Sequence, residues 1–306
     1  MANPLTTAGF PDVLDPRFRE ITDGEYAQET DRIPEFYSVE TPTQLTERWS
    51  SLGPMGLYTE FDGSIDYDGP DQSYDVTATH REYAKGVQVE RLLIEFDQFG
   101  IIETRFKLLA RSARQSRQVH AARIFNNMFS NDTQFYSHSE GVALCSNSHT
   151  TTRDGVSTGT GFDNLVTSAL SPTALRAAYT QFRKFKDAAG QPIDDNVPDC
   201  LLVPVDLRDR ADEIVRTPKG LDTAEGNINI EAGRYQVKDW VRMTDTNNWA
   251  IMNGPSMKES LRWFDKVPVE FARVEAFDEI VAKYRGYQVY TLGYGDWRWI
   301  LGAQVS

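Results

Sequence analysis

The feature that most constrains this chain of 306 residues is an uninterrupted stretch from Gln98 to Asn131. It contains no proline, its only glycine stands near its start, and good helix formers dominate it. Residues recurring at helical spacing would line one largely apolar stripe: Ile102, Phe106, Leu109, Ala113, His120, Ile124 and Met128. Such a helix would be roughly 40–50 Å long, whereas helices in globular proteins average about 11–12 residues. We therefore expect other elements to be built along this helix.

The same stretch carries an unusual charge. Residues 101–130 hold six basic residues and one acidic one, a net charge of +5 in a chain whose total is −13. The basic residues are Arg105, Lys107, Arg111, Arg114, Arg117 and Arg123, and the acid is Glu103. On a helical wheel, Lys107, Arg111 and Arg114 lie opposite the apolar stripe, with the other three on its flanks. Either they pair with carboxylates of the same fold, or they face an external anion.

Composition excludes several classes of protein. No apolar run approaches the ~20 residues of a membrane span, and the first residues lack the pattern of a signal peptide. Cys145 and Cys200 could form at most one disulfide, so neither a disulfide scaffold nor a zinc site is indicated. We expect synthesis in the cytoplasm. The pI of about 4.8 argues against a protein whose main task is gripping nucleic acid.

The N-terminal 50 residues have the pattern of an arm rather than a domain. Five prolines interrupt them, at positions 4, 11, 16, 34 and 42, and proline breaks regular elements. Apolar residues occur only in small patches. Such a segment is either disordered or extended along a neighbouring molecule, and the isolated apolar patches favour the extended form.

Residues 56–97 are predicted to form a β-hairpin with a long acidic excursion. The expected strands cover 57–61, 74–79 and 87–96, and the segment between the first two is full of turn-forming residues. Asp62, Asp66, Asp68 and Gly69 do not have the spacing of a calcium-binding loop. We interpret them as a solvated loop tip.

The rest of the chain mixes helices and strands without βαβ regularity, which indicates an α+β fold. Residues 145–168 predict a flexible loop or a boundary. A helix is expected from the N-cap Ser171 to Gly190, and a second one over 207–216, capped by Asp206. Strand-like segments are 200–205, 235–241, 248–252, 267–274, 280–292 and 296–303.

No motif predicts a catalytic, cofactor-binding or metal-binding residue. Residues 155–159 match G-x-S-x-G around Ser157, but no apolar strand precedes them and no helix follows, as a nucleophile elbow requires. A serine hydrolase is therefore the weaker alternative. The four histidines, His80, His120, His138 and His149, show no metal-ligand spacing. His120 falls on the apolar stripe, so we expect a hydrogen-bonded core histidine.

The order of these parts resembles the major capsid proteins of tailed bacteriophages, which have the Hong Kong 97 fold, and most of all the major head subunits of Mu-like phages. Nearly the whole chain takes part in the resemblance. It rests on the helix at 108–129, the strand and helix at 198–215, and the segments 245–252 and 290–303. Each motif is moderately specific, and their order and spacing strengthen the match.

The resemblance implies an N-terminal arm at 1–55, an extended loop (E-loop) at 56–97, and a peripheral domain at 98–169 built on a spine helix. An axial domain would occupy 170–280, and strands at 281–306 would return to the peripheral domain. Copies of the chain would form pentamers and hexamers of an icosahedral shell around the double-stranded DNA genome of a phage, in the virion. An encapsulin-like shell around protein cargo is the alternative with the same fold.

Further expectations follow from the same resemblance. A portal protein, a separate scaffold protein and a decoration protein are the other partners it implies. Lys85 is the only lysine of residues 56–86, and its place at the base of the excursion predicts no covalent crosslinking between subunits. Lys107, Arg111 and Arg114 would contact the packaged DNA from the inner face of the shell. Arg105, Arg117 and Arg123 would instead pair with carboxylates of the arm or the E-loop.

Overall fold

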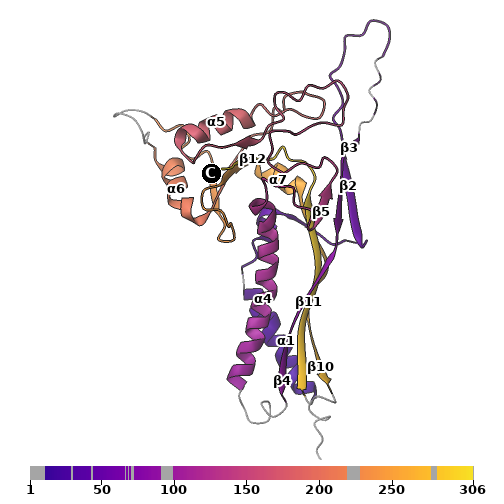
Figure 1. Ribbon diagram of the computed structural model, residues 1–306, viewed down its shortest axis with the longest axis vertical. Helices are drawn as coiled ribbons and strands as arrows, with labels where there is room; N and C mark the ends of the chain where they lie inside the picture. The colour runs from indigo at the N-terminus through magenta and orange to yellow at the C-terminus, as the bar shows by residue number, and fades with distance from the viewer. Residues whose placement is uncertain are drawn as a thin grey trace, which may run out of the picture.

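The computed structural model describes residues 11–28, 30–42, 44–65, 67, 69, 72–90, 99–218, 228–276 and 281–305. Figure 1 shows a long stem below a broader upper body, with a loop-tipped extension rising at the upper right. Elements from distant parts of the chain lie side by side in the stem. The fold is α+β, as predicted.

The long helix exists and runs along the stem. It is α4 (Phe99–Asn126), whose 28 residues correspond to about 42 Å. It ends five residues before the predicted Asn131, where a turn begins and Ser130 N donates to Asn127 O at 2.9 Å. A four-stranded sheet packs beside it, in the order β1 (Ser38–Glu40), β10 (Leu261–Ala276), β11 (Val281–Tyr294) and β4 (Arg81–Glu90).

The expectation of an extended arm is wrong for residues 11–28, which form the helix α1 (Pro11–Gln28). α1 packs along α4 of the same chain (Figure 1). Phe18 is fully buried, with its ring 4.7 Å from that of Phe106 and 4.8 Å from that of Tyr284. Pro11 is the first residue of the helix, where proline is tolerated. Burying one such ring is worth about 1.5–3 kcal/mol, which helps to offset the proline at position 16, inside the helix.

The extension at the upper right of Figure 1 consists of residues 46–79, and its boundaries differ from those of the predicted hairpin. Its strands are β2 (Thr46–Leu52) and β3 (Gln72–Thr79), and β5 (Tyr136–His138) completes a three-stranded sheet. The predicted strand at 57–61 is irregular backbone. The predicted third strand begins earlier, as β4, and pairs with β11 in the stem instead of extending the hairpin. Residues 91–97, Asp66 and Asp68 lie outside the described residues.

The upper body is built on a five-stranded sheet. Its order is β6 (Leu165–Val166), β12 (Ile300–Ala303), β9 (Trp249–Met252), β7 (Cys200–Val203) and β8 (Gln236–Asp239). Every residue of β7, β9 and β12 is buried. The sheet is joined by α5 (Pro172–Phe182), α6 (Arg208–Arg216), α7 (Gly254–Ser260), the short α2 (Ile33–Phe36) and the 3-10 turn η2 (Val205–Leu207).

The helix caps were predicted with mixed success. Ser171 caps α5, and its hydroxyl accepts a hydrogen bond from Ala174 N at 3.1 Å. The helix ends at Phe182, well before Gly190. Asp206 does not cap α6, because it lies inside η2 and the N-cap position falls on Leu207. The sequence pattern of a cap does not distinguish a 3-10 turn from the helix that follows it.

The last strands of the chain divide between the two parts of the molecule. We expected residues 281–306 to return to the body around the long helix, and β11 does so, whereas β12 joins the upper sheet. β10 belongs to the stem, although residues up to 280 were assigned to the axial domain. β10 also begins earlier than predicted and passes through a register irregularity around Pro268, which has no N–H to donate.

The loop at 145–168 is mostly irregular, as predicted, but it contributes to the core. Phe162 and Asn164 are buried. The Asn164 amide donates to Leu144 O at 2.9 Å and to Ile300 O at 3.1 Å. These bonds tie the loop to the last strand, so it is not the loose boundary expected from its composition.

Candidate assembly and DNA-facing surfaces

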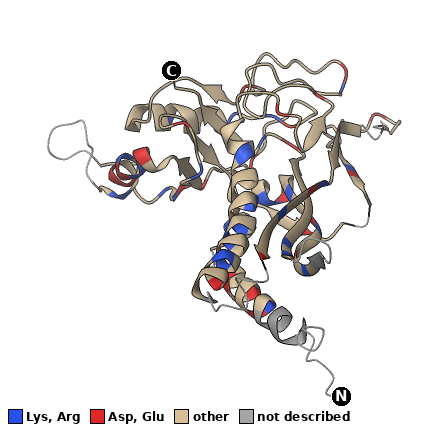
Figure 2. Ribbon diagram, turned by 60° about the horizontal axis from the view of Figure 1, so that its bottom comes forward, with Lys and Arg blue, Asp and Glu red and all other residues tan. Residues whose placement is uncertain are grey.

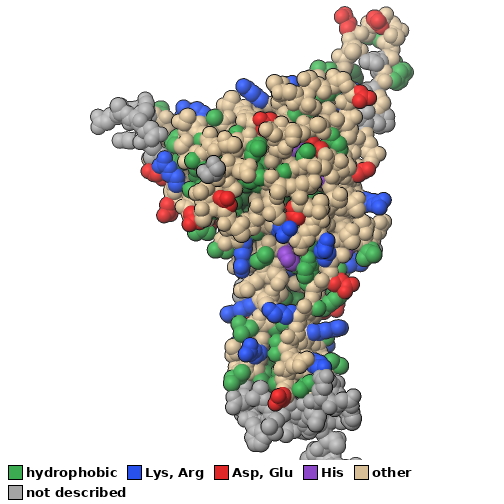
Figure 3. Space-filling model, viewed as in Figure 1, with side chains coloured by type: hydrophobic (Ala, Val, Ile, Leu, Met, Phe, Trp, Pro, Cys, Tyr) green, Lys and Arg blue, Asp and Glu red, His purple; other side chains and the backbone are tan. Residues whose placement is uncertain are grey.

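The extension exposes a dense set of large apolar side chains. Six of them lie between positions 55 and 67, and each is at least 64% exposed: Met55, Leu57, Tyr58, Phe61, Ile65 and Tyr67. Figure 3 shows that this loop stands clear of the body. Monomeric soluble proteins rarely expose contiguous apolar surface of this kind, and it usually marks an interaction site. The sequence predicted a strand at 57–61 and an acidic loop tip but no apolar interaction surface, although large apolar residues among turn formers were the available signal.

Carboxylates accompany these apolar residues. Glu60 is exposed, and Asp62 accepts hydrogen bonds from Ser64 N at 3.2 Å and from the Ser64 hydroxyl at 3.0 Å. These bonds lower the pKa of Asp62. The tip is therefore both apolar and anionic, which restricts the surfaces that could cover it to apolar ones with basic groups.

Two of the α4 arginines form ion pairs within the chain. Arg117 donates to both oxygens of Asp265 at 2.6 and 2.7 Å, and only 6% of its side chain is exposed. Arg123 pairs in the same bidentate way with Asp132, at 2.5 and 2.9 Å. Pairing was predicted for both, but the partners lie in β10 and just beyond α4 instead of in the arm or the E-loop. Arg105 is exposed and has no ion pair with any described residue.

The three residues predicted to face DNA lie in different environments. Lys107 is exposed. Arg111 donates to Glu25 of α1 at 2.5 Å, and its side chain is 49% exposed. Arg114 is nearly buried, with only 11% of its side chain exposed, because it donates to Asp31 at 2.5 Å and lies 3.9 Å from the Tyr26 ring centre.

The structure therefore corrects the helical-wheel assignment of Arg114 to an open face. α1 covers that side of α4, and Figure 2 shows its acidic residues beside the row of basic residues on α4. Burial also raises the pKa of Tyr26, which lies between the two helices. A phosphate contact through Arg114 would require it to leave Asp31, whereas Lys107 is exposed and about half of the Arg111 side chain is exposed beside Glu25.

His120 and the two cysteines serve packing. His120 Nδ1 lies 2.7 Å from the Tyr290 hydroxyl, as expected of a hydrogen-bonded core histidine, and burial lowers its pKa. Both cysteines are free and buried, and burial raises the pKa of Cys200 to about 12. Among the described residues, no three His, Cys, Asp or Glu side chains gather closely enough to hold a metal ion.

Ser157 and Lys85, which the sequence analysis also considered, lie in ordinary parts of the fold. Ser157 is exposed in an irregular loop with neither a strand before it nor a helix after it, so the nucleophile-elbow geometry is missing there. Lys85 lies in β4, opposite Gly286 of β11, on the stem and away from the extension. No helix in the described part of the chain has the length and apolar character needed to cross a membrane.

Comparison of the sequence with known families gives one match that spans most of the chain. Residues 73–303 match the family described as phage capsid protein. The chain belongs to the phage capsid protein family. It is a structural capsid protein, and its place is the capsid of a virion. No curated protein matches the sequence.

Solved structures share the fold at very low sequence identity. The mature capsid of bacteriophage PhiM1 aligns with a TM-score of 0.59 and 9% identity, covering 91% of this chain and 88% of that one. Mycobacterium phage Patience gives 0.59 and 10%, covering 99% and 90%. The capsid of an empty GTA particle gives 0.56 and 11%, with both chains covered completely. These matches confirm the predicted α+β capsid fold.

Proposed function

We propose that this phage capsid protein assembles through pentamers and hexamers into an icosahedral shell around double-stranded DNA, as a member of the Mu-like branch of the Hong Kong 97 lineage. It would be synthesised in the host cytoplasm and would act as a structural subunit without catalytic activity. The observation that carries the proposal is the extension, because six large apolar side chains without cover in the subunit require a neighbour. Heterologous contacts of this kind close into shells by symmetry.

Each part of the subunit would have its own role in the shell. We propose that β2, β3 and the loop between them act as the E-loop, the stem as the peripheral domain with α4 as its spine, and the upper body as the axial domain that gathers around the five-fold and six-fold centres. α1 would tie the arm to the spine of its own subunit. A portal protein, a scaffold protein and a decoration protein remain proposed partners.

We also propose that the basic side of α4 faces the packaged DNA. Lys107 and Arg111 are its reachable cations, and sequence-independent contacts from them to phosphate would weaken as salt rises. Arg114 would contribute mainly by holding Asp31, and so α1, in place. Because the chain carries a net charge of −13, a few such contacts would bind the genome weakly and would not fix it tightly to the inner wall of the shell.

Electron microscopy and sedimentation of the purified protein test assembly. We expect the wild type to form closed shells. A Tyr58→Ser/Phe61→Ser variant should remain unassembled while keeping the melting temperature of the unassembled subunit, because neither side chain is buried in the chain. Shells that form normally from this variant would contradict the role of the extension. Shells that co-purify with protein cargo and no nucleic acid would favour the encapsulin-like alternative.

The DNA face is tested separately with a matched control. Lys107→Gln/Arg111→Gln should leave assembly intact and lower the DNA retained in shells, measured by the ratio of absorbance at 260 to 280 nm. Arg210→Gln/Arg216→Gln removes the same charge from α6 and should retain wild-type DNA content. Equal losses in both variants would show that only net charge matters. Normal DNA content in the first variant would refute the proposed contact.

A further inference from the structure

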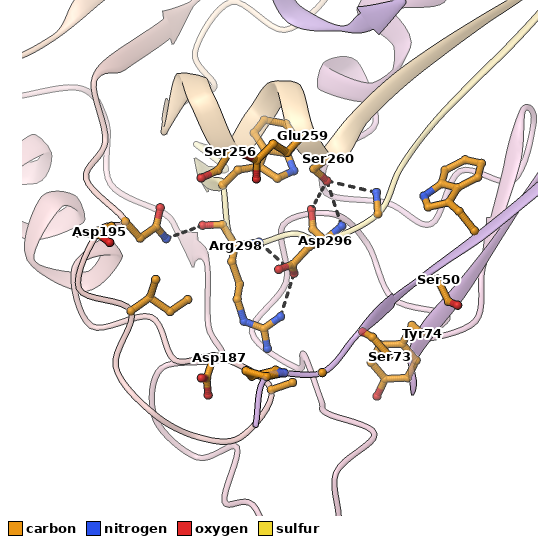
Figure 4. A pocket seen from close by; sticks show the side chains of 18 of the residues that line it. Ser50, Ser73, Tyr74, Asp187, Asp195, Ser256, Glu259, Ser260, Asp296 and Arg298 are labelled. Carbon is orange, nitrogen blue, oxygen red and sulfur yellow. Dashed lines mark hydrogen bonds and ion pairs between the residues drawn. The ribbon is translucent and has the colours of Figure 1, made fainter. Parts of the chain in front are cut away.

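A cleft lies where the extension joins the upper body. Its volume is about 760 Å³, within the range of about 300–1,000 Å³ typical of ligand pockets. One wall comes from the extension, with Trp49, Ser50 and Tyr74, and the other from residues 187–196, α7 and residues 295–299. Figure 4 shows Ser50 and Tyr74 across the cleft from Asp187 and Asp195. Anything bound there would contact both parts of the molecule.

The cleft presents negative charge that its own cations do not neutralise. Its lining holds two arginines, and each already has an acidic partner: Arg298 donates to Asp296 at 2.8 Å, and Arg262 lies 3.8 Å from Glu40. The other acids of the lining are Asp187, Asp194, Asp195 and Glu259. Across the described residues, the carboxylates of Asp195 and Glu259 have neither an ion pair nor a hydrogen bond. They are positioned to receive a cation from outside the chain.

The same lining offers aromatic surface and hydrogen-bond donors. The indole nitrogens of Trp49 and Trp299 are buried and have no hydrogen-bond partner in the described structure, and Trp299 is only 1% exposed. A Cβ placed on Gly295 would lie 3.3 Å from Trp49 Nε1, closer than an ordinary contact, so glycine at this position lets the backbone pack tightly against that indole. Because buried N–H groups are normally paired, these two donors indicate a missing acceptor.

A polypeptide satisfies these requirements together. The ammonium or guanidinium group of a lysine or arginine pairs with the carboxylates, and its aliphatic stem packs on the aromatic rings. A backbone carbonyl can accept from an indole N–H. A free polyamine supplies the cations but no carbonyl acceptor.

We propose that this cleft binds a lysine- or arginine-bearing segment of a partner protein, which would bridge the extension and the upper body. The extension of a second copy is the wrong occupant, because residues 53–71 carry acids and contain no lysine or arginine. The proposal depends on neither DNA contact nor shell geometry. A segment seated in the cleft would hold the root of the extension against the upper body and so restrict the directions in which the extension can point.

Fluorescence anisotropy with a labelled octapeptide of alternating lysine and alanine tests the proposal on the purified full-length protein. We expect saturable binding that the Asp195→Asn/Glu259→Gln variant weakens by about tenfold or more, because two charge-assisted contacts are lost. Asp206→Asn/Asp209→Asn removes the same charge near α6 and should bind like the wild type. Ser256→Arg keeps both carboxylates but places a cation in the cleft, and should also abolish binding.

Each outcome decides the question. Equal weakening in the cleft variant and the α6 variant would overturn the proposal, because the peptide would then follow net charge alone. Spermidine binding that depends on Asp195 and Glu259, without peptide binding, would replace the segment with a small amine. No binding at all would refute the site. Thermal unfolding of every variant checks folding, and the Ser256→Arg result decides if the double variant unfolds.

Discussion

The buried pair between Arg117 and Asp265 gives the sharpest test of how the stem is held together. Asp265→Ala would leave the Arg117 guanidinium 94% buried without its bidentate partner, since its side chain is 6% exposed. It would also remove the acceptor that Asp265 provides to Trp263 Nε1 at 3.0 Å. Breaking one side of a buried pair costs about 3–5 kcal/mol, and at about 2 °C per kcal/mol for a large chain this lowers the melting temperature by about 6–10 °C.

Circular dichroism of unassembled subunits at a fixed scan rate would measure this shift. Glu213→Ala is the matched control, because it breaks the exposed pair with Arg210, whose side chains are 50% and 40% exposed, and such pairs contribute about 0–1 kcal/mol. Arg117→Met/Asp265→Leu removes both charges and should melt above the single Asp265→Ala variant. The reasoning fails if Asp265→Ala costs no more than Glu213→Ala, or if the double variant melts lower still.

Three further predictions concern the arm, crosslinking and acid stability. Phe18→Ala should cost about 3–5 kcal/mol and make the α1 amides exchange faster in hydrogen exchange, whereas unchanged α1 protection would show that the aromatic cluster does not anchor the helix. Boiled shells should give one band at the monomer mass of 34.7 kDa on a denaturing gel, and a ladder would refute the absence of crosslinks. Burial raises the pKa of Asp132, but hydrogen bonds from Arg123, Asn127 and Gln134 N outweigh this, so the net pKa is lowered below 3.8. The contribution of Asp132 to stability should therefore be complete above the pKa of the unfolded state and should be lost as pH falls through the lower pKa of the folded state. Asp132→Asn should remove this part of the pH dependence of the melting temperature.

The elements predicted correctly from the sequence are those that local periodicity or a capping residue determines. The long helix and the N-cap of α5 are local signals, and both are present as expected. The helix α1 was missed because its stability comes from Phe18 packing on Phe106 and Tyr284, which no local pattern reveals. The predicted pairing of β4 within the hairpin was wrong for a related reason. Its partner β11 is distant in the chain, and the apolar pattern of a strand does not specify the sheet to which the strand belongs.

The surfaces were predicted less well than the fold. The helical wheel placed Arg114 opposite the apolar stripe, but it could not show that α1 covers that side of α4. Nor could it show that Asp31, in the segment after α1, pairs with Arg114. Tyr58 and Phe61 fall in the predicted strand at 57–61, and a strand-like pattern does not show that both side chains are exposed on a protruding loop. The cleft at the root of the extension is assembled from five separate segments, so no sequence window contains it.

The stem sheet has a consequence for the order in which the chain can fold on the ribosome. Glu90 at the end of β4 pairs with Val281 at the start of β11, and everything between them must be synthesised first. At 5–20 residues per second, the roughly 190 intervening residues take about 10–40 s. β4 and the sides of α1 and α4 that later pack on β11 therefore emerge uncovered, while the upper sheet still lacks its own last strand, β12. The stem sheet stays incomplete until β11 has been made and the upper sheet until β12 has been made, so nascent subunits are exposed to mutual aggregation at the site of synthesis.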